Sequence, residues 1–270
     1  MKKLAISNIA WEKYNDEKIL NLLHDYNVSG IELAPTKVWP EWKGINSKTI
    51  RQTKQFFDNH GFKVPAMQAI LFGKPELQLF DVSSHEAFFE HFKILAEISA
   101  GLDCSVLVFG APKNRRRFQL SVEEANDIAV DFFAKVGEIF SQNDVKLAIE
   151  NNPVEYMCDY LTNVFDVENL VKKVDSKNVK VHFDSAGVHM CRGNLSKTIE
   201  QVNEFVHYHI SEPMLEPIYE NKVNHLLGLQ ELNRIDYKHW VSIEMKQTDS
   251  EYEDIERSLQ FLNGVFDDII

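Results

Sequence analysis

Short runs of apolar and β-branched residues recur along the whole chain. Eight of them stand at residues 4–10, 30–35, 64–70, 105–112, 146–151, 179–185, 205–211 and 240–245. The longer segments between these runs have the spacing of apolar residues that is typical of helices. This alternation of strand and helix predicts a parallel α/β fold.

Several helix ends carry recognisable signals. Capping boxes are expected at Ser83-x-x-Glu86, Ser121-x-x-Glu124 and Ser250-x-x-Glu253, and helix-ending glycines at Gly61, Gly101 and Gly264. A Gly-x-Gly-x-x-Gly turn after the first run, the signal of a dinucleotide-binding fold, is absent. Eight strand–helix units without a low-complexity linker therefore predict a single-domain (β/α)8 TIM barrel over residues 1–270.

Composition narrows the class of function. The chain of 270 residues is 44% hydrophobic, enough for one sizeable core, and its formal net charge is −12. Nucleic acid is not an expected partner, because binding to the phosphate backbone needs concentrated Lys and Arg. The basic run at residues 115–117 is expected to be a solvated loop.

No targeting or membrane segment is expected. The sequence has neither the apolar core of a signal peptide nor a run long enough to span a bilayer, which predicts a cytoplasmic protein without a membrane partner. Its three cysteines, Cys104, Cys158 and Cys191, lack C-x-x-C spacing and are expected to be buried or unreactive thiols.

The stretch AIENNPVEY, residues 148–156, places an acid where a strand should end. Read with a period of two, Lys146, Ala148 and Glu150 share one face before the chain reaches the breaker Pro153. The C-terminal ends of barrel strands carry the active site in such folds. Glu150 is therefore a candidate site residue.

The last three strands repeat this feature. Asp184, His209 and Glu244 stand at nearly the same depth in their runs as Glu150 does in its own. Converging carboxylates would repel one another, whereas a divalent ion between them turns the repulsion into ligation. A set of oxygen and imidazole ligands suits Mn, Mg, Co or Zn, so we expect one divalent metal ion at this rim.

The chain resembles the xylose isomerase-like TIM barrels, the sugar (phosphate) isomerases and epimerases that include the D-tagatose 3-epimerase-like enzymes. The resemblance covers essentially the whole chain and rests on Glu150, Asp184, His209 and Glu244 and on the motifs NIAW, GIELAP, MQAILFGKPEL, FGAPKNR, IENNP, HISEP and SIEMK. It implies that these four residues bind one divalent metal. It also implies that Glu150 and Glu244 transfer protons through an enediolate of a ketose-like sugar or sugar phosphate.

Two positions depart from the epimerase pattern. Those enzymes usually have a His three residues after the Asp, but here the run is DSAGVH, and the nearest candidate is His189, five residues on. The Arg expected soon after His209 is missing, and Glu212 and Glu216 stand there instead. A substrate other than a simple free ketohexose is therefore expected.

Other residues are candidates for the substrate pocket. Lys246 shares the face of Glu244 and could bind a substrate carboxylate or phosphate, or merely balance nearby acids. Glu32 could bond to sugar hydroxyls or serve a structural role. The aromatic residues that follow strand ends could wall the pocket: they are Trp11, Trp39, Trp42 and Phe72. The long connection 71–82 is expected to close over a bound substrate, and 111–120 is long as well.

Three other functions remain open. A lyase or dehydratase of a keto-polyol would begin with the same α-proton abstraction, and product analysis would separate it. A non-catalytic sugar-binding barrel would bind metal without exchanging that proton. An abasic-site endonuclease needs more metal ligands, but Gln68 stands near the end of the third run and no Asp-x-His follows on the late strands. Association into a homo-oligomer is also open.

Overall fold

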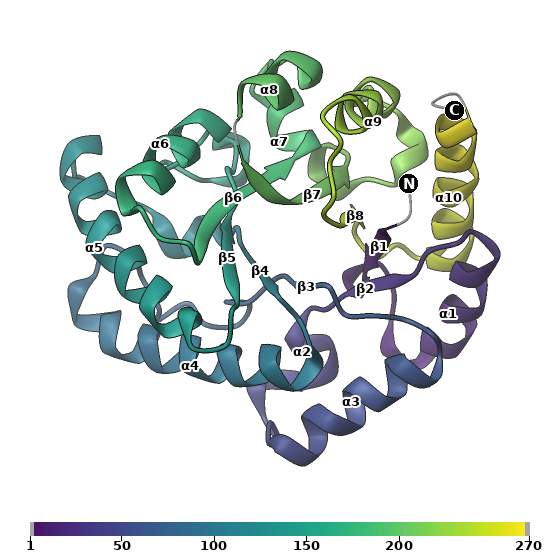
Figure 1. The fold of residues 1–270 in the computed structure, drawn as a ribbon, viewed down its shortest axis with the longest axis horizontal. Helices are drawn as coiled ribbons and strands as arrows, with labels where there is room; N and C mark the ends of the chain where they lie inside the picture. Colours follow the sequence, from purple (N-terminus) through teal and green to yellow (C-terminus); the bar gives the residue numbers. More distant parts are fainter. Residues whose placement is uncertain (1–2, 203, 268–270) are drawn as a thin grey trace.

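Eight parallel strands form a ring that is surrounded by helices (Figure 1). The computed structural model describes residues 3–202 and 204–267. The strands are β1 (Leu4–Ser7), β2 (Gly30–Glu32), β3 (Ala66–Met67), β4 (Val106–Phe109), β5 (Lys146–Ile149), β6 (Val179–Asp184), β7 (Phe205–Ser211) and β8 (Val241–Glu244). They pair in the order β2-β1-β8-β7-β6-β5-β4-β3. Backbone bonds from Leu33 N to Ala66 O (2.9 Å) and from Gln68 N to Leu33 O (3.0 Å) nearly close the ring. The predicted barrel is confirmed.

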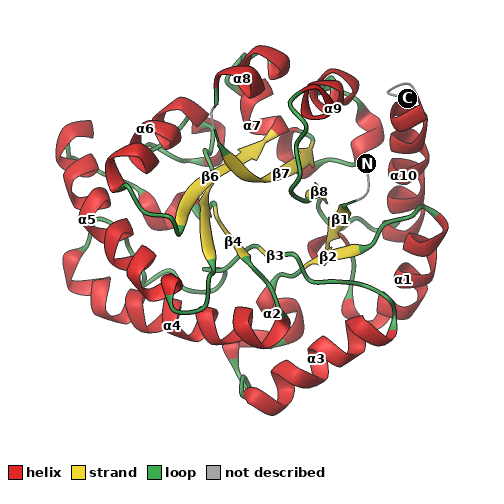
Figure 2. Ribbon diagram, in the orientation of Figure 1, coloured by secondary structure: helices red, strands yellow, loops and turns green. Residues whose placement is uncertain are grey.

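The helices cover the outside of the ring (Figure 2). They are α1 (Asp16–Asp25), α2 (Pro35–Val38), α3 (Ser47–Asn59), α4 (His85–Leu102), α5 (Val122–Ser141), α6 (Val164–Val174), α7 (Ser185–Met190), α8 (Leu195–Gln201), α9 (His225–Arg234) and α10 (Glu251–Asp267). Helix α5 begins at the expected capping box, in which Ser121 Oγ accepts from Glu124 N at 3.2 Å and the Glu124 carboxylate accepts from Ser121 N at 2.8 Å. Gly61 follows α3 with a φ of +76°, as a helix-ending glycine does.

Three of the expected helix-end signals are wrong. Near Ser83 the capping side chain is Asp81, which accepts from the Ser83 amide at 3.0 Å. Gly101 lies inside α4, where a Cβ would stand 2.4 Å from Cγ2 of Ile50 on α3. This glycine therefore permits close packing of two helices. Gly264 lies inside α10, which continues past it.

The barrel interior has an apolar layer and a polar layer. Small apolar residues from four strands pack together: Ala66, Val106, Ala148 and Val206. Towards the C-terminal ends of the strands, buried polar side chains take over: they include Ser7, Glu32, Gln68, His182, His207 and Ser242. Branched apolar residues normally fill such an interior, so the polar layer is a candidate functional site.

A β-bulge aligns the last strands. The pairing of β6 with β7 shifts after Val181, because β7 has one extra residue, Val206. Val206 joins the apolar layer, and the ring of its neighbour His207 also faces the interior. Beyond the bulge, Asp184 pairs with His209. The bulge thus brings an acid and an imidazole level with each other at the barrel rim.

The expectations drawn from composition meet the structure at two points. Among the described residues, no helix is long and apolar enough to cross a membrane. Cys104 and Cys158 are buried, whereas Cys191 is exposed. Burial raises the pKa of the Cys104 thiol to about 12, which makes that thiol a poor nucleophile.

Candidate metal centre and active site

Four side chains from successive strands converge at the C-terminal end of the barrel. Glu150 follows β5, Asp184 ends β6, His209 lies near the end of β7, and Glu244 ends β8. One ligand atom from each lies within 4.8 Å of the others. From His209 Nδ1, the nearest carboxylate oxygens of Glu244, Glu150 and Asp184 are 3.2, 3.8 and 4.0 Å away. The structure therefore brings together the four residues that the sequence singled out.

The carboxylates of this set repel one another electrostatically. Burial, followed by the charges of Glu244 and Asp184, raises the pKa of Glu150 to about 8. Burial and the Glu244 charge raise the pKa of Asp184 to about 6. Like charges this close favour protonation of at least one carboxyl group. The set therefore needs a proton or a cation between its members.

The donor set fits a divalent cation. His209 Nδ1 is buried and has no hydrogen-bond partner among the described residues, so it can serve as a ligand atom once the ring has lost its second proton. Three carboxylates and one imidazole suit Mn, Mg, Co or Zn. Glu150 and Glu244 also line a cavity of about 350 Å³, so a cation held here would be accessible to a small molecule.

A buried carboxylate orients the His209 ring. Glu32 is fully buried, and its oxygens lie 3.0 and 3.2 Å from His209 Nε2 and 3.3 Å from His207 Nε2. Burial alone would raise the pKa of Glu32, but the charges of His209 and His207 outweigh it and hold that pKa well below its usual range. Burial also opposes protonation of His209, yet Glu32 and Glu244 raise the pKa of that ring well above its ordinary value. The position of Glu32 favours the orienting role over contact with substrate.

Neutral donors hold two of the other candidate ligands, Asp184 and Glu150. Asp184 accepts a bond of 2.6 Å from Ser211 Oγ and a short bond from the Gly187 amide at the start of α7. Asn152 Nδ2 donates to Glu150 Oε2 at 3.1 Å. Such partners fix the directions of ligand oxygens.

Arg115 is buried and binds the backbone of Glu150, so the expectation that residues 115–117 form a solvated basic loop is wrong for this residue. Its side chain is fully buried and donates from Nη1 to the carbonyl oxygen of Glu150 at 2.6 Å. The next arginines are only partly buried, and Arg117 binds the Asp159 carbonyl and side chain. Sequence spacing gave no signal for the inward turn of Arg115.

The cavity wall comes mainly from the connections after β3 and β4. Its lining residues are Gln68, Ala69, Ile70, Leu71, Phe72, Val108, Gly110, Ala111, Pro112, Lys113, Asn114, Glu150, Asn152 and Glu244. Phe72 is 68% exposed, so its ring stands at the mouth. Tyr156 is a further neighbour of the site that the sequence did not reveal: burial, then the site's acids, raise its pKa to about 12. A tyrosine placed there remains a neutral hydrogen-bonding group.

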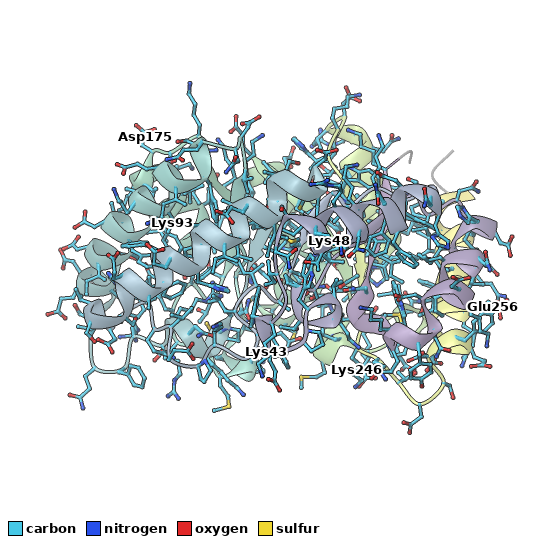
Figure 3. The ribbon with its side chains drawn as sticks, turned by 90° about the horizontal axis from the view of Figure 1, so that it is seen from below. Lys43, Lys48, Lys93, Asp175, Lys246 and Glu256 are labelled. Carbon is cyan, nitrogen blue, oxygen red and sulfur yellow. The ribbon has the colours of Figure 1, made fainter. Side chains whose placement is uncertain are left out.

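Several expected pocket residues lie elsewhere. Lys246 Nζ pairs with Glu216 Oε1 at 2.6 Å and projects from the edge of the molecule (Figure 3). His189 is exposed on α7. Trp11 is buried and donates from Nε1 to Asp16 at 2.8 Å. Neither of the next two aromatic candidates lines the cavity. Trp39 is buried, and Trp42 is partly buried and donates from Nε1 to the Phe72 carbonyl oxygen.

A second group of possible ligands lies deeper in the barrel. Nitrogens of His182, His207 and His209 also lie within 4.8 Å of one another. Burial, then the neighbouring rings, lowers the pKa of His182 well below its ordinary value, so this ring is neutral. The four residues at the barrel rim, Glu150, Asp184, His209 and Glu244, are called the rim set below. None of the three rings lines the 350 Å³ cavity, whereas Glu150 and Glu244 of the rim set do. Access to substrate therefore favours the rim set as the reactive centre.

The connections after β3 and β4 are tied together. Asn114 Nδ2 donates to the carbonyl oxygens of Lys74 (2.8 Å) and Leu77 (2.7 Å), and Leu79 N donates to Asn114 O at 2.8 Å. Leu77 and Leu79 are buried. Closure of 71–82 over a substrate stays a prediction, and these bonds confine any such movement to the part around Phe72.

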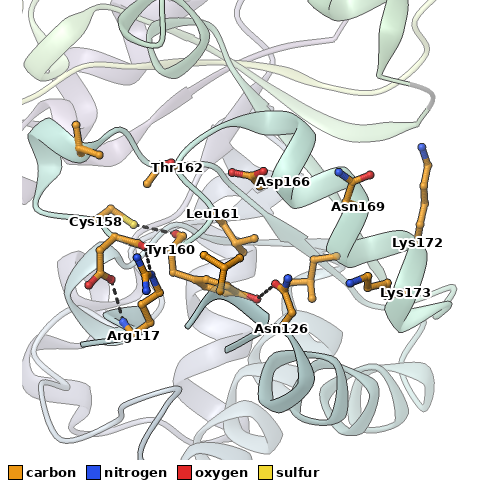
Figure 4. A pocket seen from close by; sticks show the side chains of 14 residues that line it. Arg117, Asn126, Cys158, Tyr160, Leu161, Thr162, Asp166, Asn169, Lys172 and Lys173 are labelled. Carbon is orange, nitrogen blue, oxygen red and sulfur yellow. Dashed lines mark hydrogen bonds between the residues drawn. The ribbon is translucent and has the colours of Figure 1, made fainter. Parts of the chain in front are cut away.

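A larger cavity, of about 720 Å³, is lined by residues other than the four metal-competent side chains (Figure 4). It opens between α5 and α6, and its polar lining includes Arg117, Asn126, Lys172 and Lys173. Tyr160 crosses its floor and donates to Asn126 Oδ1 at 2.9 Å. Cavity size alone therefore does not single out the candidate active site.

Comparisons with known proteins agree with this architecture. Solved structures with the same fold include D-psicose 3-epimerase with D-tagatose from Clostridium cellulolyticum H10 (14% identity, 97% of this chain and 99% of that chain, TM-score 0.80). Another is the IOLI protein with a zinc atom (20%, 99% and 97%, 0.75). A third is a probable 3-DHS dehydratase from Bacillus anthracis (16%, 97% and 98%, 0.75). A comparison with curated proteins gave no significant match.

At such identities, structural likeness establishes the fold and not the reaction. The family model of the xylose isomerase-like TIM barrel, however, matches residues 20–265, which is most of the chain. The chain therefore belongs to the xylose isomerase-like TIM barrel family.

Proposed function

We propose that the protein is a divalent-metal-dependent isomerase or epimerase of a ketose-like sugar or sugar derivative. The observation that carries the proposal is the rim set, in which Glu150, Asp184, His209 and Glu244 offer ligand atoms within 4.8 Å of one another beside a cavity of sugar size. A divalent cation bound there would act as a Lewis acid that acidifies the α-proton of a ketose and stabilises its enediolate. The neighbouring structures described as epimerases support the same class of reaction.

Glu150 and Glu244 are the candidates for proton transfer. Both line the cavity, whereas Asp184 and His209 do not. One glutamate would remove the proton from the α-carbon, and the other would return a proton to the opposite face. Burial of Glu150 acts in the direction that a base working near neutral pH requires, because it disfavours the ionised carboxylate.

A dehydratase of a keto-polyol is the second candidate. Its first step would be the same proton abstraction by a glutamate, after which a β-hydroxyl leaves. The missing Arg after His209 and the neighbour described as a probable dehydratase favour keeping this alternative. A non-catalytic sugar-binding barrel is the non-enzyme alternative. An endonuclease is disfavoured because the net charge is −12 and Gln68 donates to Ser7 Oγ inside the barrel.

A substrate screen in deuterated water tests the proposal. Protein loaded with Mn²⁺, Co²⁺ or Zn²⁺ is incubated with ketoses, keto-inositols and their phosphates, and products are followed by NMR and mass spectrometry. We expect deuterium at the α-carbon together with an isomer or epimer, and neither with Asp184→Asn. Loss of water would identify a dehydratase. Tight metal binding without any exchange in the panel would contradict catalysis and favour a binding protein.

A further inference from the structure

We propose that the mouth of the active-site cavity is a subsite for an anionic substituent of the substrate, a carboxylate or a phosphate, with Lys113 as its cation. This inference rests on the proposed function, because it names the class of substrate that the rim set would act on. It differs from the sequence-based expectation, which placed Lys246 in that role.

Lys113 lies in the turn Pro112–Arg115 after β4 and lines the same cavity as Glu150 and Glu244. It is exposed, and the described part of the chain places no carboxylate within ion-pair distance of it. A lysine ammonium is a mobile point charge on a long stem. Lys113 could therefore meet an anionic group that enters the cavity.

The other side-chain donors of the cavity wall already have protein partners. Gln68 donates to Ser7 Oγ, Asn152 donates to Glu150, and Asn114 donates to two backbone carbonyls. Among the described lining residues, Lys113 is the side-chain donor that has no partner. A polar ligand would thus find its unengaged donor at the position of Lys113.

The turn is anchored by the two residues that follow Lys113, Asn114 and Arg115. Asn114 is bonded to the connection after β3, and Arg115 is buried against the carbonyl oxygen of Glu150 at 2.6 Å. Lys113 therefore lies at the cavity mouth, Asn114 binds the neighbouring connection, and Arg115 binds the backbone of Glu150 in the rim set. This anchoring fixes the backbone from which the Lys113 side chain extends.

Charge explains why such a subsite would need its own cation. The rim set contributes Glu150, Asp184 and Glu244, so an anionic substrate approaches a negative site. Two other lysines in the connections at this end form ion pairs: Lys246 pairs with Glu216 at 2.6 Å, and Lys74 lies 3.8 Å from Glu76. An unpaired ammonium at the mouth would hold the anionic substituent away from the acids while the keto group reaches them.

Binding measurements on metal-loaded protein test this subsite. Dissociation constants are measured by calorimetry for a ketohexose, its terminal phosphate and the corresponding keto acid. We expect the wild type to bind at least one anionic form about tenfold or more tightly than the neutral sugar, the range of a hydrogen bond to a charged group. Lys113→Gln should remove this preference, Lys113→Arg should keep most of it, and the control Lys246→Gln should leave it unchanged.

The comparison of the sugar phosphate with the keto acid identifies the anion. The ligand that binds more tightly shows whether the subsite accepts a phosphate or a carboxylate. Equal binding of all three ligands by the wild type would overturn the proposal, and so would an anion preference that survives in Lys113→Gln. Failure of the proposed function would look different: deuterium exchange would be absent for every ligand, whatever the binding preference.

Discussion

At the scale of single residues, His209 joins the metal set to the buried interior. Its Nε2 lies 3.0 Å from Glu32, which can only accept, so the hydrogen of the neutral ring belongs on Nε2. That tautomer leaves the Nδ1 lone pair facing Glu244 at 3.2 Å. The carboxylate–histidine pair would thus prepare the ring as a metal ligand, as in many metal sites.

Removal of the Glu32 charge should weaken metal binding. We expect Glu32→Gln to reduce the affinity for Zn²⁺ or Co²⁺ about 10–100-fold, the usual effect of losing such a partner. A competition assay with a chelating dye measures it. Glu212→Gln is the matched control, because Glu212 is also fully buried and binds the His225 ring at 2.7 Å outside the rim set. Equal losses in both variants would indicate general destabilisation and not an orienting role.

The four rim residues could be predicted because side chains alternate between the two faces of a strand up to the strand end. Glu150 keeps this alternation one residue past β5, but Lys246, two residues past β8, does not: β8 ends at Glu244, and the chain then turns outward to the ion pair with Glu216. The inward turn of Arg115 depends on the Glu150 carbonyl, a tertiary contact that no local pattern in the sequence encodes.

At the scale of elements, the connections after β3 and β4 act as one unit. The side chain of Asn114 joins them through the carbonyls of Lys74 and Leu77. The lengths of both connections were evident from the sequence, but this tie was not, because an asparagine in a loop has many possible partners. Gly101 shows the same limit, since its role depends on Ile50 of the neighbouring helix.

Loss of this tie should loosen the cavity wall. Asn114→Ala leaves two carbonyls without their donor and should lower the free energy of unfolding by about 1–3 kcal/mol. It should also speed proteolysis within residues 71–82 while metal affinity stays unchanged. Urea denaturation and mass spectrometry of the fragments measure these effects. Asn178→Ala, which removes a buried bond to the Val145 carbonyl at 2.7 Å, is the control. Cleavage of 71–82 at the same rate in both variants would refute the tie.

At the scale of the whole molecule, the fold concentrates negative charge at one end of the barrel. The alternation of strands and helices was enough to predict this architecture, since a (β/α)8 barrel needs only the order of its elements. The electrostatic consequence could not be read from spacing, because it depends on burial. Glu150 and Asp184 take up protons more readily in the folded chain than their ordinary pKa values of 4.5 and 3.8 imply.

Metal-free protein should therefore become less stable as pH rises. The raised pKa of Glu150, about 8, and of Asp184, about 6, mean that the folded state favours the protonated acids. Their contribution is complete below the ordinary values and is lost as pH rises through the raised ones. The raised pKa of His209 acts in the same direction. We expect the melting temperature without metal to fall from about pH 7 to pH 8, above the range in which the lowered pKa values of His182, His91 and His239 act in the opposite direction.

Added Zn²⁺ should raise the melting temperature more at pH 8 than at pH 5, because the ligands must lose protons to bind. Differential scanning calorimetry with and without a chelator measures both effects. Glu150→Gln should flatten the metal-free dependence. A metal-free melting temperature that rises from about pH 7 to pH 8 would show that the acids are not held together as described.

The central claim is that Glu150 and Glu244 act as two bases on one metal-held substrate. Strands 5 and 8 are three positions apart in the ring, so these side chains can approach a central ligand from different directions. The most direct test is deuterium incorporation by Glu150→Gln and Glu244→Gln with the ketose found in the screen, with metal content measured in the same samples. Gln keeps an oxygen ligand but cannot serve as a base. We predict that both variants lose net turnover, while at least one still exchanges the α-proton from one face. Equal and near-wild-type turnover in both would contradict the two-base account and leave only a metal-binding cage.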